Sequence, residues 1–221
     1  MLLEFYSGKK IVITAGPTYE KLDPVRFIGN YSTGKMGYAI AEELANIGAE
    51  VHLVSGPVHI KPINPNISLY KVESALEMLD VCTKLFPDCD IAIMAAAVAD
   101  YRPESYEGFK IKKSADELVL RLVKNPDILA TLGSRKKPGQ LLIGFALETN
   151  NEIANAKEKL VRKNADAIVL NSLNDSGAGF SHQTNKITII LQKDIIFEYP
   201  LKDKQLVAKD IITCISENLK N

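Results

Sequence analysis

The chain has 221 residues, of which 46% are hydrophobic and 24% are charged, as in an ordinary globular protein. Basic and acidic residues balance at 27 each, so no large net charge draws the chain to nucleic acid or to an anionic membrane, and we expect neither as a partner. The length suits one large domain, and no linker-like stretch or internal repeat divides the sequence. We therefore expect a single domain over residues 1–221.

The cysteines and the N-terminal segment exclude further classes. Cys82, Cys89 and Cys214 follow no zinc or haem spacing and lie apart from the histidines, so we expect reduced thiols and no transition-metal site. Glu4 interrupts an N-terminal segment that lacks the long apolar core of a secretory signal. No apolar run approaches the ~20 residues that span a bilayer. The expectation is a cytoplasmic enzyme.

The first half of the chain predicts alternating strands and helices. Residues 10–15 form a β-branched run before Gly16-Pro17, which is typical of a buried parallel strand. Residues 36–47 have apolar positions at helical spacing, and Gly48 suits the end of that helix. Further strands are predicted at residues 50–55, 67–72 and 90–97, and a helix with Ser74 as N-cap is predicted at residues 74–85.

Residues 98–114 interrupt this alternation and predict a long functional loop, because they contain Pro103, Gly108 and several basic residues. Asn125 and Pro126 predict the start of a helix, with Asn125 as N-cap and Pro126 as the first helical residue. The remaining predicted elements are strands at 118–123, 141–146 and 167–171, a helix at 151–163, a hairpin at 186–191 and 195–199, and a helix at 202–219.

Repeated strand–helix units predict an α/β fold: a Rossmann-like, doubly wound, mainly parallel sheet with helices on both faces, plus a C-terminal β-hairpin. Ligands of such sheets bind outside the carboxyl ends of the strands. These ends are predicted at residues 16–18, 95–97 and 144–146 and at Asn171. Unusual residues gather at these positions, so we expect the functional site at this edge.

The segment from Gly29 to Gly37 is similar to a phosphate-binding P-loop, since four residues separate Gly29 from Gly34-Lys35. Met36 replaces the Ser or Thr that binds magnesium in a P-loop, and the segment does not directly follow a strand, so a Walker fold is not expected. A small-residue loop that leads into a helix still favours anion binding through free N–H groups and the helix dipole. The alternative is a turn with an N-cap and no ligand.

Two motifs lie in the 98–114 loop. Tyr106 and Lys110 have the Tyr-x-x-x-Lys spacing of short-chain dehydrogenases, but Gly108 disfavours the helix that this pair requires. We therefore interpret the spacing as coincidence. The second motif is the basic run KIKK at 110–113. Most such runs are solvated surface, but its position after a strand end and after Asp100 favours a cationic clamp for a triphosphate.

Small residues precede Asp100, since residues 95–97 and Ala99 are all alanine. They allow a flat base or ribose to approach the backbone, although tight helix–sheet packing explains them equally well. Lys159 and Lys163 lie four residues apart on one helix face, which by itself is an ordinary charged surface. Together these patterns predict an enzyme that binds a nucleoside triphosphate without a Walker motif.

Six segments resemble, in order and with fitting spacing, the phosphopantothenoylcysteine synthetases. They are ITAGPTYEKLDPVRFIGNYSTGKMG at 13–37, AAAVADYRP at 95–103, KIKK at 110–113, KNPDIL at 124–129, GFALETN at 144–150 and RKNADAIVLN at 162–171. The resemblance covers nearly the whole chain and implies a ligase of coenzyme A biosynthesis. Such an enzyme uses CTP and Mg²⁺ to convert 4′-phosphopantothenate into an acyl-cytidylate with release of pyrophosphate. Cysteine then attacks the acyl-cytidylate and releases CMP.

The resemblance also implies how the enzyme is organised. Many bacteria fuse this activity behind a flavin-dependent decarboxylase, and the present chain is similar to the stand-alone form, for which no flavin is expected. The GPT at 16–18 and the KIKK at 110–113 resemble the bacterial, CTP-using branch. The relatives are dimers, so a homodimer is expected, with loop residues supplied across the subunit boundary. The expected partners are 4′-phosphopantothenate, cysteine and CTP.

Individual residues receive roles from the same resemblance. Asn30 is expected to contact the acyl group and to act in catalysis, and Lys110 is expected to bind phosphates as the intermediate forms. Asp127 is the expected magnesium ligand, and the backbone of residues 95–97 is expected to read the base. The other expected nucleotide-binding residues are Gly16, Ser32, Gly34, Lys35, Ala95, Ala96, Ala97, Asp100, Pro126, Asp127, Ile128, Leu129, Phe145, Lys159 and Lys163.

Two rival functions stay open on the sequence. One is a nicotinamide-dependent reductase, although the first loop lacks the Gly-x-Gly-x-x-Gly fingerprint. The other is a nucleotide-binding regulator that binds CTP and releases no pyrophosphate. A binding test with NADP and a pyrophosphate assay distinguish these functions from the ligase.

Overall fold

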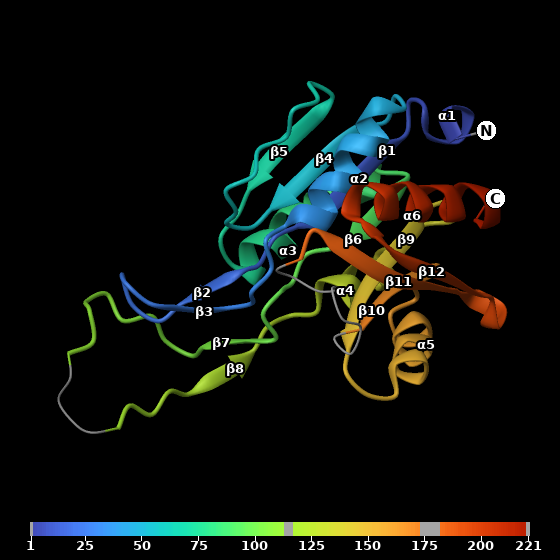
Figure 1. The fold of residues 1–221 in the computed structure, drawn as a ribbon. Helices are drawn as coiled ribbons and strands as arrows, with labels where there is room; N and C mark the ends of the chain where they lie inside the picture. Colours follow the sequence, from blue (N-terminus) through green and yellow to red (C-terminus); the bar gives the residue numbers. More distant parts are fainter. Residues whose placement is uncertain (1, 113–116, 173–181, 220–221) are drawn as a thin grey trace.

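The computed structural model describes residues 2–112, 117–172 and 182–219, and its centre is an eight-stranded sheet (Figure 1). The parallel part has the order β5 (Ile67–Lys71), β4 (Glu50–Ser55), β1 (Lys10–Ala15), β6 (Ile91–Met94), β9 (Leu141–Glu148), β10 (Ala167–Ser172). The antiparallel strands β11 (Thr184–Leu191) and β12 (Ile196–Asp203) continue the sheet beside β10. The predicted Rossmann-like fold and its C-terminal hairpin are thereby confirmed.

Helices cover both faces of the sheet (Figure 1). One face carries α1 (Leu2–Tyr6), α2 (Lys35–Asn46) and α6 (Lys204–Asn218), and the other carries α3 (Ala75–Leu85), α4 (Ile128–Arg135) and α5 (Glu152–Arg162). Successive side chains of a strand point to opposite faces of the sheet. Ile11 and Ile13 therefore pack in the first core, between the sheet and α1, α2 and α6, and Val12 packs in the second core, between the sheet and α3, α4 and α5. Two 3₁₀ turns are η1 (Phe86–Asp88) and η2 (Gln192–Asp194). Across the described ranges, no helix has both the length and the apolar character needed to cross a bilayer.

The strand order reverses at β1, because the chain continues from β1 to β4 on one side and later returns to β6 on the other. A crevice forms at such a reversal and is the usual ligand site of this sheet type. The segments that leave β1 and β6 are bonded to each other. The Ala97 N–H donates to the Gly16 carbonyl at 2.9 Å, and the Thr18 N–H donates to the Ala97 carbonyl at 3.3 Å.

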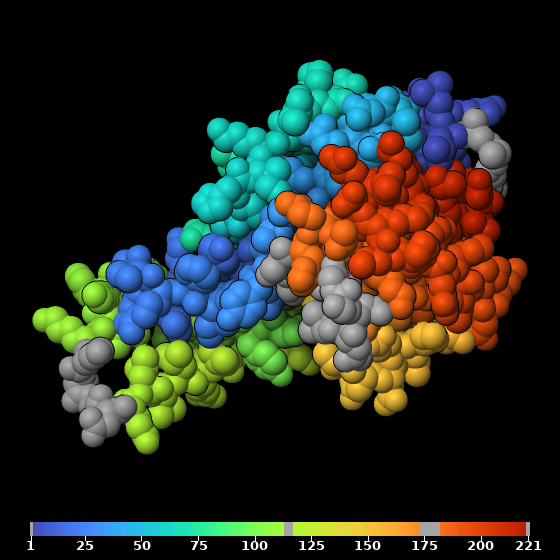
Figure 2. All heavy atoms as spheres, in the orientation of Figure 1, coloured from blue at the N-terminus to red at the C-terminus, as the bar shows by residue number. Residues whose placement is uncertain are grey.

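A projecting arm extends from this edge (Figures 1 and 2). We define the arm as residues 19–29, 101–112 and 117–124. It contains the hairpin of β2 (Tyr19–Lys21) and β3 (Phe27–Gly29) and the antiparallel pair of β7 (Tyr101–Pro103) and β8 (Leu122–Lys124). The predicted long loop at 98–114 thus contains the short strand β7, and the predicted strand at 118–123 starts later, at Leu122. The pairing joins segments about twenty residues apart, which local sequence patterns do not reveal.

The start of α4 also differs from the prediction. Asp127 is the N-cap, because its carboxylate accepts a hydrogen bond from the Ala130 N–H at 2.8 Å. Asn125, the predicted cap, instead donates from its side chain to the Ala99 carbonyl at 2.8 Å. A tertiary hydrogen bond therefore replaced the local one. The strand β6 similarly ends at Met94 rather than at residue 97, since the backbone beyond it turns to bond with the end of β1.

Gly56 provides a test of the close backbone contact at this edge. A Cβ atom at position 56 would lie 1.7 Å from the Pro17 carbonyl oxygen, so a side chain there displaces the segment that follows β1. We expect Gly56→Ala to lower the free energy of unfolding by about 1–3 kcal/mol, as overpacking usually does. Urea denaturation measures this change.

Gly108→Ala is the matched control, because nothing lies within 4 Å of a Cβ at that position. Its stability should change by less than about 0.5 kcal/mol. Equal effects of the two substitutions would contradict the close approach of Gly56 to Pro17.

Candidate functional site

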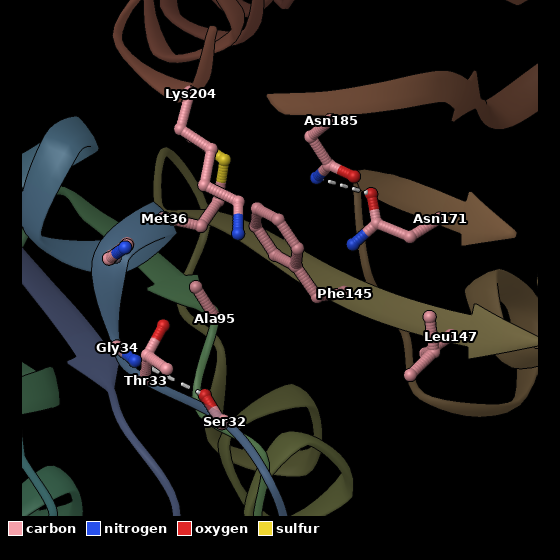
Figure 3. A pocket seen from close by; sticks show the side chains of 12 residues that line it. Ser32, Thr33, Gly34, Met36, Ala95, Phe145, Leu147, Asn171, Asn185 and Lys204 are labelled. Atoms are coloured by element: carbon pink, nitrogen blue, oxygen red, sulfur yellow. Dashed lines mark hydrogen bonds between the residues drawn. The ribbon is translucent and has the colours of Figure 1, made fainter. Parts of the chain in front are cut away.

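A pocket opens at the carboxyl ends of β6, β9 and β10, beside the starts of α2 and α6 (Figure 3). It encloses about 450 Å³, which includes space open to solvent. The side chains of Phe145 and Lys204 point into this space. The residues that line the pocket are Ser32, Thr33, Gly34, Lys35, Met36, Gly37, Ala95, Phe145, Leu147, Asn171, Asn185 and Lys204.

The glycine loop forms one wall of the pocket. Gly34, the N-cap residue of α2, has a φ of 77°, in the left-handed region that favours glycine, and offers no side chain to cap the helix start. The first N–H groups of α2 therefore remain able to bind an anion. A Cβ on Gly34 would lie 3.4 Å from the Gly16 Cα, so the two glycines lie close together. The structure thus brings together Gly16, Ser32, Gly34 and Lys35, while phosphate binding by them stays a prediction.

The alanine segment after β6 lies beside this loop. The Asn30 amide nitrogen donates to the Ala97 carbonyl at 3.0 Å and to the Val98 carbonyl at 3.3 Å. The Ala96 N–H donates to Thr14 Oγ1 at 3.1 Å. Ala95 lines the pocket directly. The predicted catalytic residue Asn30 and the predicted base-reading segment at 95–97 are therefore neighbours.

A second group of predicted residues connects to the pocket through Phe145. The Lys159 ammonium donates to the Phe145 carbonyl at 2.8 Å, and Lys163 pairs with Asp127 at 2.5 Å. Burial lowers the pKa of Lys159, while nearby carboxylates, among them Asp127 and Asp100, act in the opposite direction. Asp100, Asp127, Lys159 and Lys163 thus share one electrostatic environment.

The residues at the start of α4 contribute less side-chain surface than predicted. Ile128 is 4% exposed and Leu129 is 8% exposed, and both pack in the second core. A Cβ atom added to Gly144 would lie 2.7 Å from the Leu129 side chain, so Leu129 packs against β9. Any contact of Pro126, Ile128 and Leu129 with a nucleotide therefore depends mainly on their backbone.

Asp127 is poorly placed as a metal ligand. Its Oδ1 accepts from the Ala130 N–H, and its Oδ2 accepts from the Lys163 ammonium, which repels a second cation. Burial raises the pKa of Asp127, but the Lys163 and Ala130 hydrogen bonds outweigh burial, and the net pKa is lowered. Among residues 2–112, 117–172 and 182–219, no group of three or more His, Cys, Asp or Glu residues has a metal-binding arrangement. Magnesium binding at Asp127 stays a prediction.

Lys110 lies on the arm, is exposed and does not line the pocket of its own chain. The adjacent Ile111 is held by the first part of the arm. Its N–H donates to Asp23 Oδ2 at 3.1 Å, and its carbonyl accepts from the Arg26 guanidinium at 3.0 Å. The structure therefore places Lys110 beside the Asp23–Arg26 contact with Ile111 rather than at the pocket wall of its own chain. Lys113, the last residue of the basic run, lies outside the described residues.

Asn185 and Lys204 are among the pocket residues that the sequence interpretation missed. Asn185 is 2% exposed and donates to Asn171 Oδ1 at 3.0 Å, while its own Oδ1 has no hydrogen-bond partner in the described part of the chain. Lys204 is 8% exposed and enters the pocket from the first residue of α6. Asn185 belongs to an antiparallel strand and Lys204 was expected within a helix, so the rule about parallel strand ends indicated neither.

The Asp23 carboxylate holds the two parts of the arm together, and its substitution tests this clamp. Hydrogen bonds from the Arg26 guanidinium and from backbone N–H groups, including that of Ile111, keep the pKa of Asp23 well below its usual value. A lowered folded-state pKa means that the stabilisation is present above the unfolded-state pKa of about 4 and is lost as the pH falls through the folded-state value. At pH 7 we expect Asp23→Asn to raise the hydrogen-exchange rate of the Ile111 amide severalfold.

Asp80→Asn serves as the control, because Asp80 forms an exposed pair with Lys84 on α3. It should leave exchange in the arm unchanged. Unaltered exchange at Ile111 in Asp23→Asn would show that the arm does not depend on this carboxylate.

The comparison with known proteins covers nearly the whole chain. Residues 6–219 match the family described as DNA/pantothenate metabolism flavoprotein C-terminal domain. A cysteine/cysteine sulfinic acid decarboxylase from an unknown prokaryotic organism is 53% identical over 206 residues, which are 93% of this chain and 57% of that protein. The coenzyme A biosynthesis bifunctional protein CoaBC of Vibrio cholerae is 43% identical over 214 residues, which are 96% of this chain and 53% of that protein. The chain thus spans about half the length of the curated relatives it matches.

Solved structures share the fold. The crystal structure of the C-terminal domain of CoaBC is 44% identical, with a TM-score of 0.82 and coverage of 97% of both chains. The DNA/pantothenate metabolism flavoprotein from Streptococcus pneumoniae is 25% identical, with a TM-score of 0.81 and coverage of 95% of this chain and 99% of that chain. A Cab2 mutant in complex with phosphopantothenate-cysteine shares the fold at 17% identity and a TM-score of 0.76, over 95% of this chain and 86% of that chain. The chain belongs to the DNA/pantothenate metabolism flavoprotein C-terminal domain family.

Proposed function

We propose that the chain is a phosphopantothenate–cysteine ligase that acts as a single nucleotide-binding domain over residues 1–221. It joins the carboxylate of 4′-phosphopantothenate to the amine of cysteine in coenzyme A biosynthesis. CTP converts the carboxylate into an acyl-cytidylate with release of pyrophosphate, and attack by cysteine releases CMP. The observation that carries the proposal is that the glycine loop and Ala95 line one pocket, while Asn30 donates to the backbone of the adjacent residues 97 and 98. This arrangement occurs in a chain that matches the C-terminal domain of CoaBC over 97% of both lengths.

The arrangement suits the chemistry of this reaction. A free carboxylate is a poor acyl donor, and esterification with CMP provides a far better leaving group. The uncapped start of α2 and the adjacent Lys35 favour the phosphate charge. Asn30 donates to the Ala97 and Val98 carbonyls, and its fixed position supports the role that we assign to it, contact with the acyl group. Lys159 and Lys163 add positive charge on the other side of Phe145. Groups fixed before the reaction stabilise developing charge without reorganisation.

Magnesium usually binds enzymes through one or two carboxylates together with substrate phosphates. Asp127 is the predicted carboxylate, but its oxygens are engaged by the Ala130 N–H and the Lys163 ammonium. Asp127 therefore does not fit as the ligand of a magnesium ion held by the protein, and no step of the proposed reaction depends on one. In the assay, Mg²⁺ is supplied as the counterion of the triphosphate.

The names of the relatives point to two chemistries, a decarboxylase and a coenzyme A biosynthesis protein. Each name describes a whole protein, and this chain spans 57% of the decarboxylase and 53% of the coenzyme A biosynthesis protein. The C-terminal domain of CoaBC is instead matched over 97% of its length, which favours the ligase. Release of CO₂ from cysteine is measured beside pyrophosphate release, so the assay separates the two chemistries.

We further propose that the chain acts as a homodimer whose arm carries Lys110 to the site of the second copy. Lys110 does not line the pocket of its own chain, and the arm projects from the sheet edge (Figure 1). Exposed apolar side chains on the arm support a contact with another subunit, because contiguous exposed apolar surface marks interaction sites. These residues are Val25, Phe27, Tyr101, Tyr106, Phe109, Leu118, Val119, Leu120 and Leu122.

The first test is pyrophosphate release with 4′-phosphopantothenate, cysteine and Mg²⁺, with CTP compared against ATP. We expect CTP-dependent release. Lys110→Gln should lower kcat/KM by about 100-fold or more, as the loss of one fixed charge-stabilising group commonly does. Asn30→Asp should accumulate acyl-cytidylate, detectable by mass spectrometry. Release of pyrophosphate with ATP alone would contradict CTP dependence. Release of CO₂ without pyrophosphate would contradict the ligase function and favour a decarboxylase.

Mixed dimers test the proposed position of Lys110. A dimer of one Lys110→Gln chain and one Asn30→Asp chain contains one intact site only if Lys110 acts on the partner copy. We expect mixing of the two inactive proteins to restore roughly a quarter of wild-type activity, because random pairing makes half of the dimers mixed and each has one intact site of two. Remixing each variant with itself is the control. Absence of restored activity in verified mixed dimers would place Lys110 in its own site.

A further inference from the structure

Two helix starts meet at the pocket. α2 begins at Lys35 and α6 begins at Lys204, and both residues line the pocket. The two helices pack against each other over the first core. Neither start has a side-chain cap, and each helix start carries partial positive charge. Two lysines and two positive helix ends therefore surround the same space.

The Lys204 side chain is held at this place. It is 8% exposed, and its ammonium donates to the His182 carbonyl at 2.8 Å. Figure 3 shows the amine directed into the pocket beside the ring of Phe145. Burial lowers the pKa of Lys204, and the charge of Lys35 lowers it further. An anion between the two lysines offsets both the free-energy cost of burying the Lys204 ammonium and its repulsion from Lys35.

Asn185 supplies an independent indication of a ligand. Its side chain is 2% exposed and lines the same pocket. It donates to Asn171, while its Oδ1 has no hydrogen-bond partner among the described residues. A buried acceptor without a donor is rare in native proteins and costs free energy. A hydroxyl or N–H group of a bound phosphate ester satisfies this oxygen.

We propose that Lys204 and Lys35 bind a phosphate group of a substrate at the inner end of the pocket, with Asn185 accepting a hydrogen bond from the same ligand. That the phosphate belongs to a substrate rests on the proposed ligase function, whereas the phosphate site itself rests on the geometry. Two substrates carry such a group: the triphosphate of CTP and the phosphate ester of 4′-phosphopantothenate.

Lys204→Gln tests the site by calorimetric titration of the full-length protein with inorganic pyrophosphate, CTP and 4′-phosphopantothenate. We expect the Kd of at least one phosphate ligand to rise about tenfold or more, because a charge-assisted hydrogen bond is lost. The salt dependence of that Kd should weaken, which a purely structural role does not cause. Lys204→Arg should retain most of the affinity.

Lys209→Gln is the matched control. Lys209 lies on the same helix, is exposed and faces Glu43 at 3.8 Å. It should change each Kd by less than about twofold. Thermal unfolding without ligand verifies that the variants are folded, and Lys204→Met, which keeps the apolar stem, replaces Lys204→Gln if the latter does not fold.

The outcomes distinguish the sources of the phosphate. Weaker binding of pyrophosphate and CTP alone assigns the site to the triphosphate, and weaker binding of 4′-phosphopantothenate alone assigns it to the phosphate ester. Unchanged affinity for all three ligands in a folded Lys204 variant, or no binding of any of them to the wild type, would overturn the proposal. If the wild type binds pyrophosphate through Lys204 yet releases none in the ligase assay, the proposed function fails and the phosphate site stands.

Discussion

The close packing of backbone at the carboxyl ends of β1, β4 and β6 is the constraint on which the rest of the site depends. Gly56 lies so close to Pro17 that a Cβ would sit 1.7 Å from the Pro17 carbonyl oxygen. The Ala97 N–H donates to the Gly16 carbonyl and the Thr18 N–H donates to the Ala97 carbonyl, so parallel backbone pairing continues beyond the strands. Main-chain hydrogen bonds join the segments after β1 and β6, and the side chains of Thr14, Thr18 and Asn30 add hydrogen bonds to the backbone of residues 96–99. This packing sets where the glycine loop, Asn30 and the alanine segment meet, and therefore where the pocket lies.

Several lysines are held in fixed positions at the pocket and beside it, in a chain whose acidic and basic residues balance. Lys163 is 9% exposed and is paired with Asp127, Lys159 is held by a carbonyl of β9, and Lys204 is held by the His182 carbonyl. Buried ammonium groups cost free energy unless they are hydrogen-bonded or paired. Because these ammonium groups are held in place before a ligand binds, they can stabilise phosphate charge with little reorganisation. The buried lysines thus connect the packing of the fold with the proposed chemistry.

The arm separates the two predicted catalytic residues, Asn30 and Lys110. Asn30 lies at the base of the arm and contacts the 97–98 backbone, whereas Lys110 lies along it, beside the clamp formed by Asp23 and Arg26. A cation that binds phosphates in its own pocket would be expected at the pocket wall, where Lys35 and Lys204 are found. The exposed apolar surface of the arm explains this separation if a second copy covers it. Assembly and catalysis are then coupled through the same segment.

The sequence by itself determined the Rossmann-like sheet, most element positions and the edge that carries the site, because helical and strand periodicities are local and because ligands of parallel sheets bind at strand ends. It also indicated Gly16, Gly34 and Asn30 as neighbours of that edge. Only the tertiary structure decided the pairing of β7 with β8, the use of Asp127 rather than Asn125 as the cap of α4, and the entry of Asn185 and Lys204 into the pocket. Each of these depends on contacts between segments far apart in the chain. Such contacts override local propensity and leave no periodic signal in the sequence.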